Sequence, residues 1–405
     1  MMFPYAEEAK QNPNLPLAGL KVLDLSRLLP GPYATLLLAD MGADVLKVED
    51  TQTGDYIRWG GPKVGGENVA FLALNRNKRS IKLNLKSDEG REIFKKLAKE
   101  ADILVESFRP GVMARLGVGY EQLQEVNPGL IYCAISGYGQ DGPYKDLAGH
   151  DLNYIGYAGA LGQTGVRDGA PVVPGVQIGD LAGGSQMAVI GILAAVQGRH
   201  LNGRGRMVDI SMTDGVVGWL VAQAAVYFAT GYKGGRGAQP LNGGLPEYNV
   251  YECADGKYLT VGALEPKFFT NLCKIIDLEA YAEVNSQGAR ATEIKTALTN
   301  RFKEKPRAEW LKLLAHEDTC VGPAYDMDEI FDDPQLQARG LVVEAEHPTA
   351  GKLKQIGLPL KLNGLGEKDI VRHPAPGYGE QTDDILTAMG YTDEQIERLK
   401  QAGVV

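Results

Sequence analysis

The chain has 405 residues, of which 44% are hydrophobic and 23% are charged, and its formal net charge is −9. This composition indicates a globular protein with a core of ordinary size and enough chain for two lobes. The basic residues form no block that would neutralise a nucleic-acid backbone, so we expect no nucleic-acid partner.

The N-terminal residues lack the basic segment and apolar core of a secretion signal, and the sequence predicts no apolar stretch of the ~18 residues that a membrane span needs. We therefore expect a cytoplasmic protein with no membrane partner. Four cysteines, Cys133, Cys253, Cys273 and Cys320, are scattered without C-x-x-C spacing. The spacing predicts neither a disulfide framework nor a thiolate metal site, and we expect buried free thiols.

The first third of the sequence alternates between strand-like and helix-like segments. Strands are predicted over residues 20–26, 43–49, 80–85, 102–108 and 128–139, and helices over 32–42 and 87–101, the second with Ser87 as its cap. This alternation predicts an α/β fold in which a mostly parallel sheet carries helices on both faces.

Residues 137–142 carry the G-x-G-x-x-G spacing of dinucleotide-binding loops, with Gly137, Gly139 and Gly142. The residues that follow, PYKDLAGHD, do not form the apolar helix whose N-terminus would hold a phosphate. We interpret the segment as a loop. Because G-x-x-x-x-G-K-[ST], H-E-x-x-H and G-x-S-x-G are absent, the sequence predicts no P-loop, no zinc protease site, no α/β-hydrolase site and no metal centre.

The pattern beyond Asp180 predicts a second, smaller part of the molecule. It predicts a long buried helix over 181–203, a strand over 205–212, a helix over 213–231 and a linker over 231–246, which is rich in glycine and polar residues. Residues 248–264 then contain two strand-like runs around a D-G turn, followed by helices near 266–277, 290–303, 307–315 and, capped by Thr392, over 392–403. We interpret the region after the linker as an α+β lobe.

Asp180 stands where a strand-like run gives way to the helix predicted over 181–203, so its simplest interpretation is a helix N-cap. Gly183 and Gly184 complicate this interpretation, because each glycine in a helix costs about 0.5–1 kcal/mol relative to alanine. Close approach of the backbone to a ligand, or free N–H groups that hold an oxyanion, would explain them. Taken singly, His150 is interpreted as a structural histidine and Glu265 as a residue that opens a helix.

Longer segments make the chain similar to a known superfamily, that of the family III CoA-transferases and α-methylacyl-CoA racemases (CaiB/BaiF-like proteins). The resemblance is carried by LPGPYATLLLADMGADVLKVE, LNRNKRSIKLNLKSDEGREIFKKLAKEADILVESFRPGVMARLG, SGYGQDGP, AGHDLNY, GDLAGG, GRGRMVDISM, GGLPEYNVYECADGKYLTVGALEPKFF and PAPGYGEQTDDIL. These segments extend over nearly the whole chain.

The resemblance implies a large Rossmann-like domain, formed by residues 1–230 and a return segment over 331–405, and a small α+β domain over 247–330 after the linker. It also implies a dimer of two interlocked chains, whose active site lies at the interface. A heteromer with a related subunit stays open as an alternative to the homodimer.

Two chemistries share the aspartate of the G-D segment in this superfamily. In the racemases, a histidine in A-G-H-D and that aspartate exchange the proton at the α-carbon, and a glutamate in E-P-x-F supports the histidine; here these are His150, Asp180 and Glu265. The resemblance thus favours racemisation as the first interpretation. The alternative is CoA transfer through an Asp180 anhydride and thioester, because the long segment 65–81 and the chain length are similar to transferases.

The same resemblance assigns the substrate contacts. Arg115 matches the superfamily arginine that meets CoA phosphates, and Arg109, Lys78 and Arg79 are further candidates for CoA binding. Asp151 and Tyr154 are candidate residues of the substrate pocket, where Tyr157 and Leu161 would also line an apolar space. Coenzyme A is expected as part of an acyl-CoA substrate, with no tightly bound cofactor, and a free carboxylic acid is the acceptor if the chain is a transferase.

Overall fold

The computed structural model of the chain describes residues 2–283 and 288–405, which form two compact units. The first unit comprises Met1–Ala158, Val176–Gly218 and Gln337–Val405, and the second comprises Gly159–Gly175 and Trp219–Leu336. The segment predicted as a linker, 231–246, lies inside the second unit. The chain therefore changes unit four times, and no pattern in the sequence predicted that Gly159–Gly175 belongs to the second unit.

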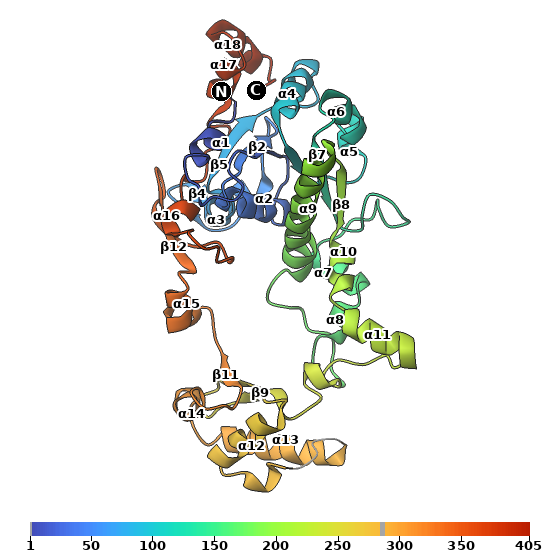
Figure 1. Cartoon of the computed structure of the whole chain (residues 1–405), viewed down its shortest axis with the longest axis vertical. Helices are drawn as coiled ribbons and strands as arrows, with labels where there is room; N and C mark the ends of the chain where they lie inside the picture. The colour runs from blue at the N-terminus through green and yellow to red at the C-terminus, as the bar shows by residue number, and fades with distance from the viewer. Residues whose placement is uncertain (1, 284–287) are drawn as a thin grey trace. The chain divides into compact units, whose positions relative to one another are not determined.

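A six-stranded parallel sheet forms the centre of the first unit (Figure 1). Its strands are β1 (Lys21–Asp24), β2 (Asp44–Glu49), β5 (Lys78–Lys82), β6 (Ile103–Glu106), β7 (Ile131–Ser136) and β8 (Met207–Ser211). They lie in the order β5-β2-β1-β6-β7-β8. Numbered by their succession in the chain this is 3-2-1-4-5-6, the Rossmann order, in which the switch point between β1 and β6 opens a crevice at the carboxyl ends of the strands.

Helices cover both faces of this sheet, as the alternating pattern predicts. On one face α2 (Pro30–Asp40) and α9 (Met187–Asn202) pack against residues such as Val22, Val105 and Ile135. On the other face α4 (Asp88–Glu100), α6 (Tyr120–Val126), α17 (Thr382–Ala388) and α18 (Asp393–Gln401) pack against the alternate strand residues, such as Leu23 and Leu104. Ser87 caps α4 by accepting from the Gly90 N–H, and Thr392 caps α18.

The C-terminal segment joins the edge of the sheet. The Gln381 N–H donates to the Ser80 carbonyl at 3.0 Å, and the Ser80 N–H donates to Gln381 Oε1 at 2.7 Å. The remaining elements of the first unit are α1 (Pro4–Ala9), η1 (Tyr56–Arg58), β3 (Lys63–Val64), β4 (Glu67–Asn68), α3 (Val69–Asn75), α5 (Val112–Arg115), α7 (Asp151–Tyr157), η2 (Gly179–Gln186), α10 (Met212–Gly218), β12 (Val342–His347), β13 (Gly351–Ile356) and α16 (Glu367–Ile370).

Two of the predicted helices differ in the structure. The helix predicted over 181–203 starts earlier, as the π-helical η2, and continues as α9. The helix predicted over 213–231 is divided into α10 and α11 (Val221–Thr230), which belong to different units. The span Gly179–Asn202 is long and apolar enough to cross a membrane, which corrects the expectation that no such stretch exists. Of the apolar 18-residue window within this span, 56% is buried inside the fold.

The second unit contains a three-stranded antiparallel sheet in the order β11-β10-β9. Strands β9 (Tyr248–Glu252) and β10 (Tyr258–Gly262) flank the predicted D-G turn, and β11 (Val321–Ala324) pairs with β10. Tyr251, Leu259 and Trp310 belong to the buried core under α12 (Pro266–Ile275), α13 (Ala289–Phe302) and α14 (Arg307–Leu314). The other elements are α8 (Ala160–Gln163), η3 (Pro240–Asn242), η4 (Glu279–Tyr281), η5 (Ile330–Asp332) and α15 (Pro334–Ala338), which crosses into the first unit.

Candidate active site

Asp180 is the second residue of η2, and the residue that precedes this helix is Ile178. The interpretation of Asp180 as an N-cap is therefore wrong, because the helix has already begun at Gly179. The Asp180 side chain is half-buried, and none of its neighbours within residues 2–283 and 288–405 donates a hydrogen bond to its carboxylate. Single π-helical turns are frequent at functional sites, so the local backbone is a second signal beside the carboxylate.

Two neighbours from α7 set the electrostatics of Asp180. The Asp180 N–H donates to Asp151 Oδ1 at 3.0 Å. Burial and the charge of Asp151 raise the pKa of Asp180 to about 6, while His150 opposes this rise. His150 is exposed at the start of α7, where its N–H donates to Asn153 Oδ1 at 3.1 Å. The structure therefore brings His150, Asp151 and Asp180 together within one unit.

The glycines after Asp180 have a packing role. A Cβ on Gly183 would lie 2.4 Å from the Met212 carbonyl oxygen, and one on Gly184 would lie 3.2 Å from Pro30 Cβ. Both residues are buried where η2 crosses α10 and α2. Packing alone thus favours glycine at both positions, because a Cβ on Gly183 would collide with the Met212 carbonyl and one on Gly184 would be tight against Pro30. The expected approach of a ligand to their backbone stays a prediction.

A cluster of four tyrosines lies next to His150 in the loop after β7 and on α7, and consists of Tyr138, Tyr144, Tyr154 and Tyr157. The Tyr138 ring lies 5.3 Å from the rings of Tyr154 and Tyr157. Burial, followed by the charge of Asp180, raises the pKa of Tyr154 to about 12, while Arg109 lowers it. Residues 137–149 form an irregular loop, so the structure shows no helix that would support dinucleotide binding by G-x-G-x-x-G.

Arg109 follows β6 at the switch point of the sheet, and its side chain is exposed. Arg27 follows β1 on the other side of that point; its N–H donates to Ser107 Oγ at 3.1 Å, and its guanidinium lies 5.2 Å from the Phe108 ring. Arg27 Nη2 also lies 2.7 Å from Asp50 Oδ2. No motif in the sequence indicated Arg27, although its place after the first strand of the alternating pattern was a usable signal. Arg115 is exposed at the end of α5. Arg109 and Arg115 form no ion pair within the described part of the chain.

Lys78 and Arg79 do not have free cationic groups. Lys78 Nζ is fully buried 3.1 Å from Asp24 Oδ2 and donates to Thr35 Oγ1 at 2.8 Å. Arg79 Nη2 lies 2.8 Å from Asp44 Oδ1, also inside the fold. We therefore correct the assignment of both residues from CoA binding to internal ion pairing, because breaking a buried pair leaves an uncompensated charge.

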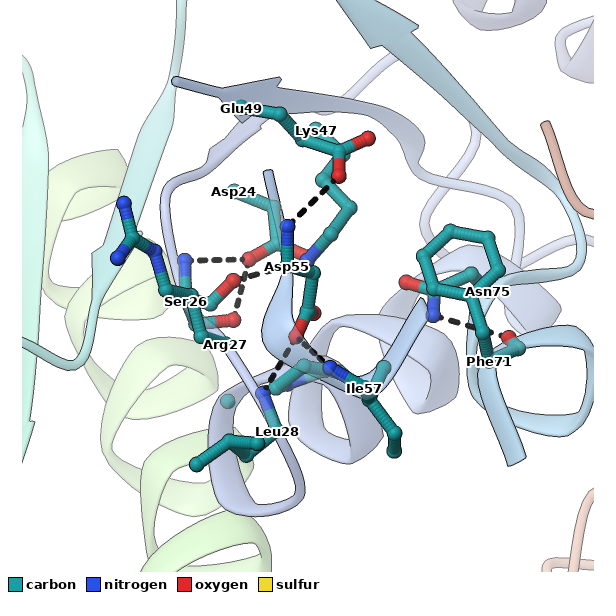
Figure 2. Close-up of polar contacts among 12 residues, drawn as sticks. Asp24, Ser26, Arg27, Leu28, Lys47, Glu49, Asp55, Ile57, Phe71 and Asn75 are labelled. Atoms are coloured by element: carbon teal, nitrogen blue, oxygen red, sulfur yellow. Dashed lines mark hydrogen bonds and ion pairs between the residues drawn. The ribbon is translucent and has the colours of Figure 1, made fainter. Parts of the chain in front are cut away.

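A buried charge cluster lies under the carboxyl end of β1 (Figure 2). Lys47 Nζ lies 2.9 Å from Asp55 Oδ2 and donates to the Ser26 carbonyl at 2.8 Å. Asp55 Oδ1 accepts from the Leu28 N–H at 3.0 Å and from the Ile57 N–H at 3.2 Å, as Figure 2 shows. This cluster fixes the loop between β1 and α2, and no motif in the sequence indicated it.

Glu265 belongs to the second unit, where it directly precedes α12. Gly183, Gly184, Tyr154 and the residues around Asp180 belong to the first unit. Within the residues that the structure describes, no group of three or more His, Cys, Asp or Glu side chains has the arrangement of a metal site.

Known proteins resemble the chain along almost its full length. The profile of the CoA-transferase family III matches residues 17–382. Succinyl-CoA:glutarate CoA-transferase from Homo sapiens is 37% identical over 398 residues, covering 96% of this chain and 90% of that protein. Alpha-methylacyl-CoA racemase from Homo sapiens is 33% identical over 395 residues, covering 96% and 97%. The crystal structure of a CAIB/BAIF family protein from Brucella suis, 32% identical, gives a TM-score of 0.81 and covers 93% of this chain and 100% of that one.

Proposed function

The chain belongs to CoA-transferase family III, and from this premise we propose that it moves CoA between two carboxylic acids with Asp180 as the nucleophile. The observation that carries the proposal is the state of the Asp180 carboxylate. It is half-buried, it receives no hydrogen bond from a described residue, and its pKa is raised to about 6. Such a carboxylate is ionised at neutral pH yet more nucleophilic than a fully solvated one.

The reaction proceeds through covalent intermediates on this side chain. An Asp180 oxygen attacks the thioester carbon of the donor, the C–S bond breaks, and CoA thiolate leaves a mixed anhydride. The thiolate then attacks Asp180 Cγ, which releases the donor acid and forms an aspartyl-CoA thioester. The acceptor carboxylate attacks Cγ of this thioester, CoA thiolate leaves, and a second mixed anhydride forms. The thiolate then attacks the acceptor acyl carbon of that anhydride, which forms the acceptor acyl-CoA and frees the Asp180 carboxylate. Atoms and charges balance without water or an external base.

We propose small dicarboxylic acids as the acids exchanged. This choice rests on the relatives, since the names of several of them specify succinate, glutarate or oxalate. Arg109 and Arg115 are the proposed contacts of the CoA phosphates, because both guanidinium groups are exposed and unpaired within the described residues. Tyr154 and Asp151 are proposed to line the pocket around Asp180, and CoA enters as substrate.

Racemisation at an α-carbon is the second candidate function. The observation that favours it is the electrostatic coupling of His150 to Asp180, the two groups that this chemistry needs. We give it second place because the transferases named above are up to 37% identical to the chain, against 33% for the racemase, and because His150 is exposed. Under this function Glu265 is proposed to support His150.

One experiment separates the two functions. The enzyme is incubated in deuterium oxide with 2-methylacyl-CoA esters and with glutaryl-CoA, each with and without free succinate, and the product masses are followed. We expect succinyl-CoA to form only when succinate is present, with no deuterium at the α-carbon. Deuterium incorporation without any acceptor would instead establish racemisation and contradict CoA transfer as the main activity.

The assembly that we propose is a dimer with a second copy of this chain, and the cytoplasm is its proposed location. Helix α11, VAQAAVYFAT, has no charged residue and no buried residue, and Val221 and Phe228 are 72% and 82% exposed. Contiguous apolar surface of this kind marks an interaction site. If the chain instead forms a heteromer with a related subunit, the chain purified alone should show its single-chain mass.

A further inference from the structure

The backbone beneath Asp180 is bonded to a buried hydroxyl. Ser185, on the same π-helical segment, is fully buried. Its Oγ donates to the Pro30 carbonyl at 2.6 Å and lies 3.1 Å from the Asp180 carbonyl. A hydroxyl has one hydrogen to donate, so the hydrogen bond to the Pro30 carbonyl is the stronger one and the bond to the Asp180 carbonyl is weaker. The Asp180 peptide is thus linked through Ser185 to Pro30, the first residue of α2, where the loop that follows β1 ends.

That loop is itself fixed by the buried charge cluster. Leu28 has a φ of +64°, a left-handed conformation that leucine rarely adopts. Its N–H donates to Asp55 Oδ1 at 3.0 Å, and Lys47 holds both Asp55 and the Ser26 carbonyl (Figure 2). A strained conformation of this kind persists only where the surroundings hold it, and here it lies two residues before Pro30.

Packing around η2 leaves the backbone little freedom to adjust. A Cβ on Gly184 would lie 3.2 Å from Pro30 Cβ, and a Cβ on Gly215 would lie 2.4 Å from the Gly183 carbonyl oxygen. The helix therefore packs closely against the Pro30 side chain of α2 and against the backbone of α10. Ser185 supplies the polar contact in this interface, and its hydroxyl has no access to a substrate.

We propose that Ser185 is a positioning residue for Asp180: its hydroxyl holds the π-helical backbone of η2 against the fixed loop at Pro30 and so sets the direction of the Asp180 carboxylate. The inference rests on the proposed function only in taking Asp180 as the reacting group. Without the hydroxyl, the carbonyls of Pro30 and Asp180 lose a donor and the first turn of η2 is free to relax toward α-helical geometry. A misplaced reacting group slows the chemical step more than it weakens binding.

The test compares Ser185→Ala with a matched control, Ser80→Ala. Ser80 is equally buried and its Oγ donates to Glu49 Oε1 at 2.6 Å, but it has no bond to η2. For each variant we would measure kcat and KM for the acyl-CoA donor, the single-turnover release of CoA, and the melting midpoint. We expect Ser185→Ala to lower kcat and the single-turnover rate about tenfold to a hundredfold with KM within about twofold of the natural chain. Ser80→Ala should lower the melting midpoint but keep kcat within about twofold.

Two results would overturn the inference. The first is a natural kcat in Ser185→Ala. The second is a loss of activity in Ser185→Ala that equals the loss in Ser80→Ala when the two variants have the same folded fraction. If Ser185→Ala does not fold, Ser185→Cys replaces it: the weak S–H donor should still lower kcat at least about fivefold, and natural kcat in that variant overturns the inference equally. Asp180→Asn is assayed alongside. Full transfer by Asp180→Asn would contradict the proposed function, whereas an inactive Asp180→Asn beside an unaffected Ser185→Ala contradicts only the role of Ser185.

Discussion

The carboxylate of Asp180 is half-buried beside Asp151, and both features raise its pKa, to about 6. A raised pKa means that the group is protonated, and so not nucleophilic, at any pH well below that value. We therefore expect kcat/KM to rise with pH through an inflection near pH 6 and to level off above it. A pH profile measured with a donor whose own carboxyl groups stay ionised across this range checks the expectation.

Asp151→Asn sharpens this prediction. The amide keeps an oxygen that accepts from the Asp180 N–H, but it removes the neighbouring negative charge that raises the pKa of Asp180. The acid limb of the profile should therefore move to lower pH. An unchanged limb in Asp151→Asn would show that another group controls it.

Lys78 gives the second prediction for a single residue. It is fully buried against Asp24, so Lys78→Met should lower the free energy of unfolding by about 3–5 kcal/mol, because it removes one member of a buried pair. Urea unfolding checks this. Lys95→Met is the control: Lys95 is half-buried and pairs with the exposed Glu92, so this variant should change stability by less than about 1 kcal/mol. If Lys78 instead contacts CoA, a folded variant of unchanged stability would show a raised KM for the donor.

At the scale of elements, the alternating pattern predicted β1, α2, β2, α4, β6 and β7 close to their observed bounds, since each buries an apolar face that is visible in the sequence. The breaks in the long helices were not predictable in the same way. Apolar residues continue through 213–231, so the sequence pattern did not mark the break between α10 and α11. Likewise the resemblance drew attention to Asp180 and His150, whose roles stay predictions. No such signal marked Ser185 or Asp55, because their bonds to Pro30 and Leu28 join residues far apart in the chain.

The crossing of η2 and α10 gives a prediction about packing. Gly183→Ala would place a methyl group 2.4 Å from the Met212 carbonyl oxygen, so we expect it to destabilise the fold by about 1–3 kcal/mol. Gly156→Ala, on α7, is the matched control because a Cβ there meets nothing within 4 Å. That variant should be neutral or stabilising by up to about 1 kcal/mol. Equal melting midpoints for the two variants would contradict the packing role of Gly183.

At the scale of the whole molecule, the alternation of strands and helices predicted the parallel sheet of the first unit, but not the four crossings of the chain between units. No change in amino-acid composition marks these crossings. The composition of Gly159–Gly175, for example, is similar to that of the glycine-rich loops around it. Boundaries between units depend on which surfaces the chain covers, and this is a property of tertiary packing.

The exposed helix α11 leads to a prediction about the oligomeric state of the protein. We expect the natural chain to elute with twice its own mass, and Phe228→Arg to shift it toward the single-chain mass, because a charge would be placed in an apolar contact. Light scattering coupled to gel filtration measures both. Leu201→Arg, at an equally exposed leucine on α9, should leave the mass unchanged. A natural chain that is already monomeric would contradict the proposed assembly.

The four cysteine thiols differ in exposure, so the protein can be labelled selectively at one of them. Cys133, Cys253 and Cys273 are buried, and burial raises the pKa of each thiol, so they react slowly with alkylating reagents. Cys320 is exposed on the second unit. A fluorophore or spin label added to the folded, unmutated protein will therefore attach there and mark the second unit alone.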